Sequence, residues 1–504
     1  MKIFSTDQIR KWDQYTIQHE PVASIDLMER AAEKCVQWLL NNSFTNKKFK
    51  IVCGKGNNGG DGLAIARLLS SKGLSAEVYI LEVVKLGTDD FQTNLQRLHK
   101  LPVIIHHIQS SEYFPLFDEG DIIVDALYGS GINKPLTGLS QDLVQHINNT
   151  GNKVISIDVP SGLYMDESSS GHIVIKADYT LSFQTHKLGL LVAENAACIG
   201  DVHILDIGLH HDFIDKEESD FYLTDVALIS KIFRPRKLFA HKGSYGHALM
   251  IGGNYGKIGA ILLATKACLQ AGTGLTTSYL PACGYNILQT AAPEAMVITD
   301  KNENQINGLP PDVKKYSAIG IGPGIGTAEE TQKTIVELLQ VFKKPIVIDA
   351  DGLNCLALRK DGFIHLPPYS ILTPHPKEFE RPFGECKNDF ERIRLARKKA
   401  KELNVIILLK GHHTFIATPT GQGYFNNTGN AGMAKGGSGD VLTGIITSFL
   451  AQGYTPVDAS IFGVFIHGLA GDIAAETLSK ESMLATDIIN FLGQAFKLVN
   501  EKTK

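Results

Sequence analysis

Two glycine-rich segments that contain an aspartate are the parts of this chain best suited to chemistry. The first is GNNGGDG at residues 56–62, and the second is GGSGD at residues 436–440. Each follows an extended or loop-like stretch and opens an apolar, helix-like run. Glycines let backbone N–H groups approach a phosphate, and a helix N-terminus adds partial positive charge. The two loops therefore predict two nucleotide sites in two domains.

Side-chain oxygens follow several strands that we expect in the first half of the chain. Asp125 ends the apolar run 121–125, Asp158 ends the run 153–158, and Ser161 comes three residues later. In a parallel sheet, the carboxyl ends of neighbouring strands face one crevice, which would bring these groups close to Asn58 of the first loop. Such a set contains no cysteine or histidine and suits a hard cation.

The elements that must position these groups alternate between strand and helix in both halves. In the first half, strands are expected at 51–53, 76–81, 121–125, 153–158, 179–183 and 202–206, with a helix at 63–72 after the first loop. The same alternation restarts at residue 247, and the run 441–451 after the second loop is apolar nearly all round, as in a buried helix. The pattern predicts layered α/β domains. Residues 209–237 change character, and the polar run 210–220 within them is expected to be a linker or a solvated loop, with the domain boundary near 215–225.

Composition narrows the class of protein. A chain of 504 residues is long enough for two or three domains. Its net charge of −4 implies no surface for nucleic acid. The seven cysteines include no Cys-x-x-Cys pair, which favours a reducing compartment. We expect no signal peptide and no apolar stretch of about 20 residues that could span a membrane, and hence a soluble cytoplasmic protein.

Three motifs of the first half together resemble the NAD(P)H-hydrate epimerase domain, over about residues 1–215. They are NNGGDG (57–62), DALYGSG (125–131) and DVPSG (158–162). The resemblance implies a Rossmann-like domain, which we assign to residues 1–218. It would interconvert the R and S epimers of NADH or NADPH hydrated at C6 of the nicotinamide ring.

This resemblance also implies site residues. Asn58, Asp125 and Ser161 would hold a potassium ion, and Asp158 would contact the reacting part of the ligand. We interpret Asp158 as an acid/base group at the C6 hydroxyl, aided by the cation, which requires hydrogen-bond reach. The residues implied to contact the hydrate are Asn57, Asn58, Gly59, Gly60, Asp61, Gly129, Ser130, Gly131, Ile132, Asn133, Lys134, Pro135 and Asp158.

The second loop suits phosphoryl transfer. Its amides and the following helix would stabilise the transferring group, and Asp440 could accept a proton from an attacking hydroxyl. This arrangement resembles the ribokinase-like superfamily. A longer series resembles the NAD(P)H-hydrate dehydratase domain over about residues 225–500, and we assign residues 219–504 to it. The series includes GPG (322–324), DADGLN (349–354), TPHPKEF (373–379), KGHHT (410–414) and NAGM (430–433).

That second resemblance implies phosphorylation of the C6 hydroxyl by ADP with Mg²⁺, followed by elimination of phosphate to regenerate NAD(P)H. The residues implied to bind the S hydrate are Ala260, Gly324, His375 and Asp440. Those implied to bind the nucleotide are Lys410, Gly411, His412, His413, Thr414, Asn430, Ala431, Gly432, Met433, Ala434, Lys435, Gly436, Gly437, Ser438 and Gly439. Asp158 and Asp440 are the expected catalytic residues. Lys377 and the pair His412–His413 depart from the family pattern without removing a proposed functional group.

The sequence thus favours a bifunctional repair enzyme, expected to be a homo-oligomer that acts on the hydrates of NADH and NADPH. Two alternatives stay open. A ribokinase-like small-molecule kinase with an accessory domain would release a phosphorylated product. A nucleotide sensor without turnover would need neither Asp158 nor Asp440 at a reacting centre.

Overall fold

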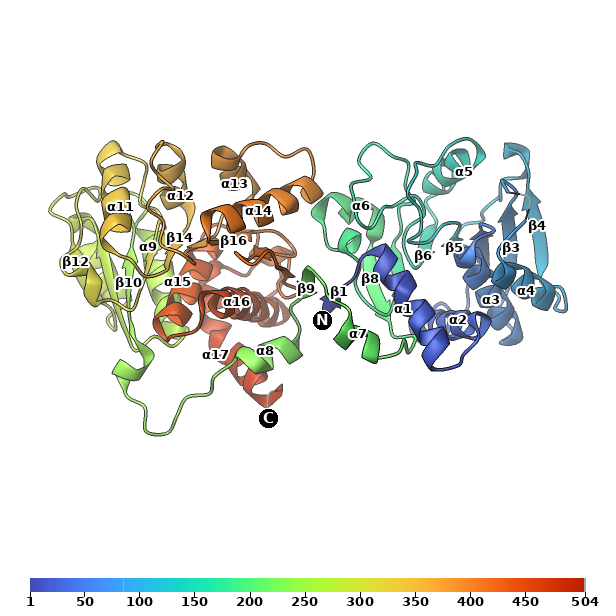
Figure 1. Cartoon of the computed structure of the whole chain (residues 1–504), viewed down its shortest axis with the longest axis horizontal. Helices are drawn as coiled ribbons and strands as arrows, with labels where there is room; N and C mark the ends of the chain where they lie inside the picture. The colour runs from blue at the N-terminus through green and yellow to red at the C-terminus, as the bar shows by residue number, and fades with distance from the viewer. Residues whose placement is uncertain (85, 503–504) are drawn as a thin grey trace. The chain divides into compact units, whose positions relative to one another are not determined.

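The chain divides into two compact α/β units in a computed structural model that describes residues 1–84 and 86–502. One unit comprises Lys2–Ser219 with Asn388–Phe390, and the other comprises Met1, Asp220–Lys387 and Glu391–Lys504. Each unit places helices against a largely parallel sheet (Figure 1). This confirms the predicted α/β fold class.

The first unit contains a seven-stranded sheet in the order β4-β3-β2-β5-β6-β7-β8, with every neighbouring pair parallel. After the short β1 (Lys2–Ile3), its strands are β2 (Phe49–Cys53), β3 (Ala76–Leu81), β4 (Ile104–Ile108), β5 (Ile122–Ala126), β6 (Lys153–Ile157), β7 (Tyr179–Phe183) and β8 (Asp201–Leu205). Its helices are α1 (Thr6–His19), α2 (Ser24–Asn41), α3 (Asn57–Ser71), α4 (Asp89–Leu98), α5 (Leu139–Asn148), α6 (Ala196–Ile199) and α7 (Asp212–Lys216).

Alternating strand residues divide this unit into three layers. Ile51 and Cys53 of β2 belong to a buried cluster that includes residues of α2, α3 and α4. Val52, between them, belongs to a cluster on the other face that includes Leu143 and Val144 of α5. Because successive side chains of a strand point to opposite faces, β2 is buried on both sides. The sheet is therefore covered on both faces, as a parallel sheet requires.

The first glycine-rich segment is helical where the sequence predicted a loop. Helix α3 begins at Asn57, six residues before the expected start, and Gly56 is its N-cap residue. A Cβ on Gly59 would lie 1.7 Å from Gly54 O, and a Cβ on Gly62 would lie 2.6 Å from Ala126 Cβ. These glycines let the first turns of α3 pack closely against the ends of β2 and β5, which a pattern of residue types does not reveal.

The sheet of the second unit runs β9-β18-β17-β16-β15-β14-β13-β10-β11-β12 and is parallel except at the pairs β16–β17 and β17–β18. Its strands are β9 (Phe221–Leu223), β10 (His247–Ile251), β11 (Leu275–Leu280), β12 (Met296–Thr299), β13 (Ala318–Ile321), β14 (Ile346–Ile348), β15 (Ile371–Leu372), β16 (Ile406–Leu409), β17 (Phe415–Ala417) and β18 (Gly423–Phe425). Its helices are α8 (Val226–Ile232), α9 (Ile258–Gln270), α10 (Tyr285–Ala291), α11 (Glu329–Val341), α12 (Ala350–Ala357), α13 (Pro376–Phe383), α14 (Asp389–Leu403), α15 (Ser438–Ala451), α16 (Pro456–Leu478) and α17 (Ala485–Lys502).

The apolar helices α15 and α16 form the centre of the second unit's largest core cluster. Helix α15 is buried along its length from Val441 to Phe449, as predicted from its apolar composition. Helix α16 is long and apolar enough to cross a membrane by length and composition, which the sequence reading did not anticipate, and 72% of its most apolar window is buried. Burial in this core accounts for its composition.

The region 209–237, which includes the predicted linker or solvated loop at 210–220, holds α7, β9 and α8. Phe213 packs against Trp12 and Phe4, and Ile229 is buried in the core of the second unit. Within the run 210–220, Phe213 is buried and the other residues are exposed or half-buried, and the division between the two units falls after Ser219.

Candidate active sites

A cavity of about 1250 Å³ lies at the carboxyl ends of β2, β5, β6 and β7 in the first unit. This is the crevice where open parallel sheets bind ligands. The predicted residues that line it are Asn57, Asn58, Asp61, Gly129, Ser130, Gly131, Ile132, Lys134, Pro135 and Asp158. Gly59 and Gly60 instead contact Gly54 and Met28 inside the unit, and Asn133 is exposed outside the lining. The cavity thus gathers most of the predicted set from three separate segments of chain.

Asp125 and Ser161, two of the three predicted cation ligands, are in direct contact. Ser161 Oγ donates to Asp125 Oδ1 at 2.5 Å, and Ser161 N–H donates to Asp125 Oδ2 at 2.9 Å. Burial raises the pKa of the Asp125 carboxyl, although hydrogen bonds from Ser161 and Ser156 oppose this.

The third predicted ligand, Asn58, is buried, and neither its Oδ1 nor its Nδ2 has a hydrogen-bond partner among the residues the structure describes. A buried amide without a partner costs free energy, so this side chain is arranged for something that the protein alone does not supply. The oxygen-only donor set fits a hard cation. Within residues 1–84 and 86–502, no group of three His, Cys, Asp or Glu side chains could hold a metal ion.

Asp158 is held by two charge-assisted contacts at the end of β6. Its Oδ1 lies 2.9 Å from Lys187 Nζ, and its Oδ2 accepts a hydrogen bond of 2.9 Å from Ser130 N–H. The backbone of Asp158 has a φ of 67°, a left-handed conformation that is uncommon outside glycine. Burial alone would raise the pKa of Asp158, but the Lys187 charge and the Ser130 N–H outweigh burial and hold the pKa below its ordinary value. Asp158 is therefore ionised at neutral pH.

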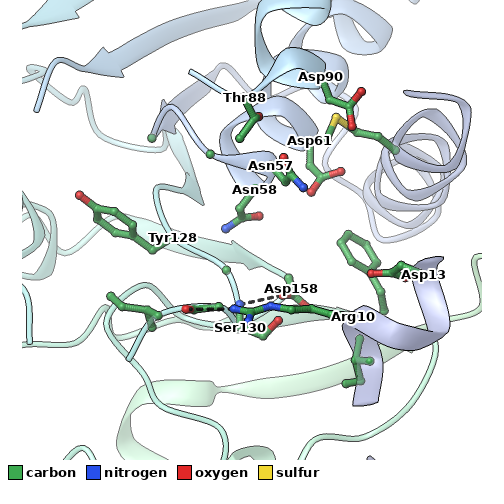
Figure 2. Close-up of a pocket in the computed structure, with 18 of the residues that line it drawn as sticks. Arg10, Asp13, Asn57, Asn58, Asp61, Thr88, Asp90, Tyr128, Ser130 and Asp158 are labelled. Carbon is green, nitrogen blue, oxygen red and sulfur yellow. Dashed lines mark hydrogen bonds between the residues drawn. The ribbon is translucent and has the colours of Figure 1, made fainter. Parts of the chain in front are cut away.

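Three other aspartates, Asp13, Asp61 and Asp90, line the same cavity (Figure 2). Burial raises the pKa of Asp13 to about 7, with the charge of Asp158 adding to this effect and that of Lys187 opposing it. Burial and the charges of Asp158 and Asp13 also raise the pKa of Asp61 well above its ordinary value. The cavity thus contains carboxyl groups in different protonation states at neutral pH.

Sequence reasoning missed Asp13 and Lys187. Asp13 lies in the middle of α1 and belongs to no motif, so no sequence signal identified it. Lys187 follows β7 by four residues. The position after a strand end, which drew attention to Asp158, could have pointed to it.

A second group of charged residues gathers around the start of α15 in the second unit. Asp349 Oδ1 accepts a hydrogen bond of 2.7 Å from Lys410 Nζ, and Asp349 Oδ2 accepts one of 2.7 Å from Thr443 Oγ1. Burial and the charge of Asp349 raise the pKa of Asp440 to about 7, while Lys410 opposes this shift. Asp349 and Glu378 keep the pKa of Lys410 high despite burial. Sequence analysis included Asp349 in the motif DADGLN (349–354) but did not assign it to the site.

The second glycine-rich loop forms the N-terminus of α15, a helix of 14 residues. Gly437 is its N-cap with a φ of 93°, a conformation that favours glycine. No atom lies within 4 Å of a Cβ built on Gly436, so this peptide faces open space. Lys435 Nζ donates to Met483 O at 2.8 Å, which ties the loop to the start of α17. The geometry suits a phosphate at the helix N-terminus.

The other predicted nucleotide residues lie in two segments. Asn430 Nδ2 donates to Asp472 Oδ1 of α16 at 2.9 Å and begins the short turn Ala431–Met433, which leads through Ala434 into the glycine-rich loop. Gly411, His412, His413 and Thr414 connect Lys410 at the end of β16 to β17, and the His413 ring lies 3.0 Å from Asn426 O. Burial lowers the pKa of His413, so its ring is neutral at pH 7.

The predicted hydrate residues of this unit have different surroundings. A Cβ on Gly324, where φ is 62°, would lie 3.0 Å from Ala260 Cβ, so these two positions are adjacent. His375 is the N-cap of α13, accepts from Glu378 N–H, and is 48% exposed. Its cap explains its position in the chain without reference to a ligand, and its Nε2 lies 3.4 Å from Glu378 Oε1, although the side chain is still exposed enough for a ligand to reach it.

Comparison with known proteins matches each unit to a family. Residues 24–189 match the family described as YjeF-related protein N-terminus, and residues 248–493 match the family described as NAD(P)H-hydrate dehydratase. A bifunctional NAD(P)H-hydrate repair enzyme from Moorella thermoacetica is 33% identical over 100% of this chain and 98% of its own length. A protein of the same name from Escherichia coli is 32% identical over 97% of this chain and 93% of its own. Among solved structures, a ribokinase-like superfamily protein from Enterococcus faecalis is 28% identical over 56% of this chain and 98% of its own, with a TM-score of 0.50.

Proposed function

The chain belongs to the family of bifunctional NAD(P)H-hydrate repair enzymes, and on that premise we propose how its two sites divide the work. The enzyme epimerises NAD(P)H hydrate and dehydrates it to NAD(P)H. We assign epimerisation to residues 1–218 and dehydration to residues 219–504. The observation that carries this division is that each unit has its own buried set of carboxylates at the carboxyl ends of a parallel sheet.

In the first unit, the cavity at the sheet edge would bind the hydrate. Asn57 and the segment 129–135 would contact the ligand, while Asp158 would act at the C6 hydroxyl. Because Asp158 is ionised at neutral pH, it suits the role of hydrogen-bond acceptor and base.

A potassium ion would be held by Asn58, Asp125 and Ser161. The amide of Asn58, buried without a protein partner, supports this assignment. When bound, the ion would supply positive charge close to the reacting hydroxyl.

In the second unit, the peptides of the loop 436–439 would hold the phosphates of ADP, and Mg²⁺, when bound, would neutralise part of their charge. The open face of Gly436 and the helix N-terminus of α15 support a phosphate at this place. Asp440 would take the proton of the C6 hydroxyl as that oxygen attacks the terminal phosphorus and AMP departs. Loss of the C5 proton and of the phosphate group with its bonding electron pair then forms the C5=C6 bond of NAD(P)H.

Two further assignments concern the compartment in which the protein works and its oligomeric state. We propose that it works in the cytoplasm, which its scattered free cysteines favour, and that it forms a homo-oligomer.

The test uses the purified chain with a mixture of R and S hydrate. With ADP, we expect complete recovery of nicotinamide absorbance and release of inorganic phosphate. Asp440→Asn should leave epimerisation intact and stop recovery, while Asp158→Asn should limit recovery to the S fraction. A stable phosphorylated product without NADH would instead identify a kinase, and nucleotide binding without any product would identify a sensor. Running ADP against ATP in parallel decides the phosphate donor.

A further inference from the structure

Four aspartates from separate elements line the cavity of the first unit (Figure 2), and Asp90 of α4 accepts a hydrogen bond of 2.6 Å from Ser24 Oγ. Asp13 comes from α1, Asp61 from the second turn of α3, and Asp158 from the residue after β6. The orphaned amide of Asn58 faces the same space and indicates that the cavity receives a polar ligand.

The carboxylates differ in their partners. Lys187 pairs with Asp158, and its Nζ also donates to Ser182 Oγ at 2.7 Å. Arg10, on the same helix as Asp13, lies 3.3 Å from Asp7 and donates to Gly131 O. Across the described residues, the carboxyl group of Asp13 has neither a hydrogen bond nor an ion pair of its own. It is therefore free to contact a ligand.

Helix α1 holds Asp13 in a fixed place. The neighbouring Trp12 is buried, stacks on Phe213 at 5.6 Å, and donates from Nε1 to His210 O at 2.9 Å. Thr16, one turn further on, accepts a hydrogen bond from His210 N–H at 2.9 Å. A side chain on so firmly packed an element can be positioned for proton transfer.

We propose that Asp13 is a second catalytic residue of the epimerase site, which donates the proton to the departing C6 oxygen while Asp158 receives the proton of the water that returns. This inference rests on the epimerase function proposed above and adds the acid that Asp158, ionised and paired with Lys187, does not provide.

The step balances as follows. Asp13 protonates the C6 hydroxyl, the C6–O bond breaks with its electron pair on oxygen, and water departs. The lone pair of the ring nitrogen N1 forms the N1=C6 bond. Water adds to the opposite face, the π electrons return to N1, and the extra proton passes to Asp158. The reverse reaction uses the two carboxyl groups in exchanged roles, so both directions need one proton on the pair.

Electrostatics support this division of roles. Besides Asp13, the charged groups that line the cavity are Arg10 on the same helix, Lys55, Asp61, Asp90, Lys134, Asp158 and Lys187. Burial and Asp158 raise the pKa of Asp13 to about 7, where a group both gives and takes protons readily. Burial, with the charges of Asp158 and Asp13, raises the pKa of Asp61 well above its ordinary value.

The test is Asp13→Asn in the full chain, with R and S hydrate separated directly in the absence of ADP. We expect kcat for epimerisation to fall by about 100-fold or more. The wild type should show a falling limb near pH 7, because the doubly ionised pair lacks the acid, and the residual activity of the variant should lack this limb. ADP-dependent dehydration of the S hydrate should not change.

Asp7→Asn, an exposed change of the same kind on the same helix, is the matched control and should epimerise at the wild-type rate. If Asp13→Asn keeps the wild-type rate and pH profile, Asp13 is not the acid. If the wild type does not epimerise the hydrate, the proposed function fails instead. Should Asp13→Asn not fold, the wild-type profile decides, and a flat profile between about pH 6 and pH 9 would overturn the inference.

Discussion

Replacing Lys187 with methionine is expected to destabilise the first unit strongly, because it leaves Asp158 buried without its cation. Lys187 Nζ lies 2.9 Å from Asp158 Oδ1, and the two side chains are only 2% and 15% exposed. Removing one partner of a buried ion pair costs about 3–5 kcal/mol. Since Asp158 keeps its hydrogen bond from Ser130 N–H and borders a cavity, we expect the free energy of unfolding to fall by about 3 kcal/mol, near the lower end of that range. In a unit of this size, that corresponds to a Tm lower by about 6–12 °C.

Tryptophan fluorescence measures this change in the first unit alone. The chain has two tryptophans, Trp12 and Trp38, and both lie in that unit. Urea unfolding followed by their emission therefore reports its free energy of unfolding without a contribution from the second unit. Lys11→Met, an exposed change on α1, is the matched control and should stay within about 0.5 kcal/mol of the wild type.

The stability difference between the wild type and Lys187→Met depends on pH with a definite sign. In the wild type, the lowered pKa of Asp158 contributes stability above its unfolded-state pKa, and this contribution is lost as the pH falls through the folded-state value. In Lys187→Met, the unpaired carboxyl has a raised pKa, so the variant is most stable when acid protonates it. The difference between the two proteins should shrink as the pH falls from 7 towards about 4.

A double variant tests the cause. Lys187→Met with Asp158→Asn removes both charges and should recover more than half of the lost stability. A loss below about 1 kcal/mol in Lys187→Met, or additive losses in the double variant, would refute the reasoning that an uncompensated buried charge is the cause.

Three further changes have expected outcomes. Asp440→Asn should lower the rate of dehydration by about 100-fold or more, while titration with ADP should show unchanged binding. Because Asp440 must be ionised to act as a base, the wild-type dehydration rate should rise with pH through about 7. A flat pH profile would contradict this role. Gly59→Ala would place a Cβ 1.7 Å from Gly54 O and should lower the free energy of unfolding of the first unit by about 1–3 kcal/mol, measured by tryptophan fluorescence. Gly56→Ala is the matched control, since its Cβ would meet no atom of the described residues within 4 Å, and it should change this free energy little. Replacing K⁺ by tetramethylammonium should slow epimerisation in the wild type, and Asn58→Ala should remove that dependence; equal rates in both salts would argue against a potassium site.

Sequence reasoning located the fold class and the strand-end carboxylates because both follow from local patterns. An apolar run that ends in aspartate, as at Asp125 and Asp158, marks the edge of a parallel sheet whatever the rest of the fold does. Asp13 and Lys187 escaped because their meaning depends on contacts with residues far away in the chain. Lys187 matters through Asp158, 29 positions earlier by number, and only β7 and its following turn bring the two together.

Local packing also explains where α3 begins. The run of four glycines in residues 56–62 reads as a loop, since glycine disfavours helix interiors. In the structure, Gly59, Gly60 and Gly62 are helical, and each faces a neighbour that lies too close for a Cβ. The cost in helix propensity, about 1 kcal/mol for each glycine relative to alanine, is offset by close packing that no larger residue would allow. Propensity alone therefore placed the start of α3 too late.

The two units use the same electrostatic arrangement on different elements. In the second unit, Lys410 neutralises Asp349, and the nearby Asp440 has a pKa raised to about 7. In the first unit, a lysine likewise neutralises one aspartate while Asp13 is raised to about 7. An ion pair next to a third carboxyl group adds little net charge. Burial therefore dominates the pKa of that third group, which titrates near neutral pH. Breaking either pair by removing its lysine adds an uncompensated negative charge and should raise the neighbouring pKa further. Lys410→Met should therefore move the rising limb of the dehydration rate, which depends on Asp440, to higher pH; a limb that stays in place would show that the pair does not control the catalytic base.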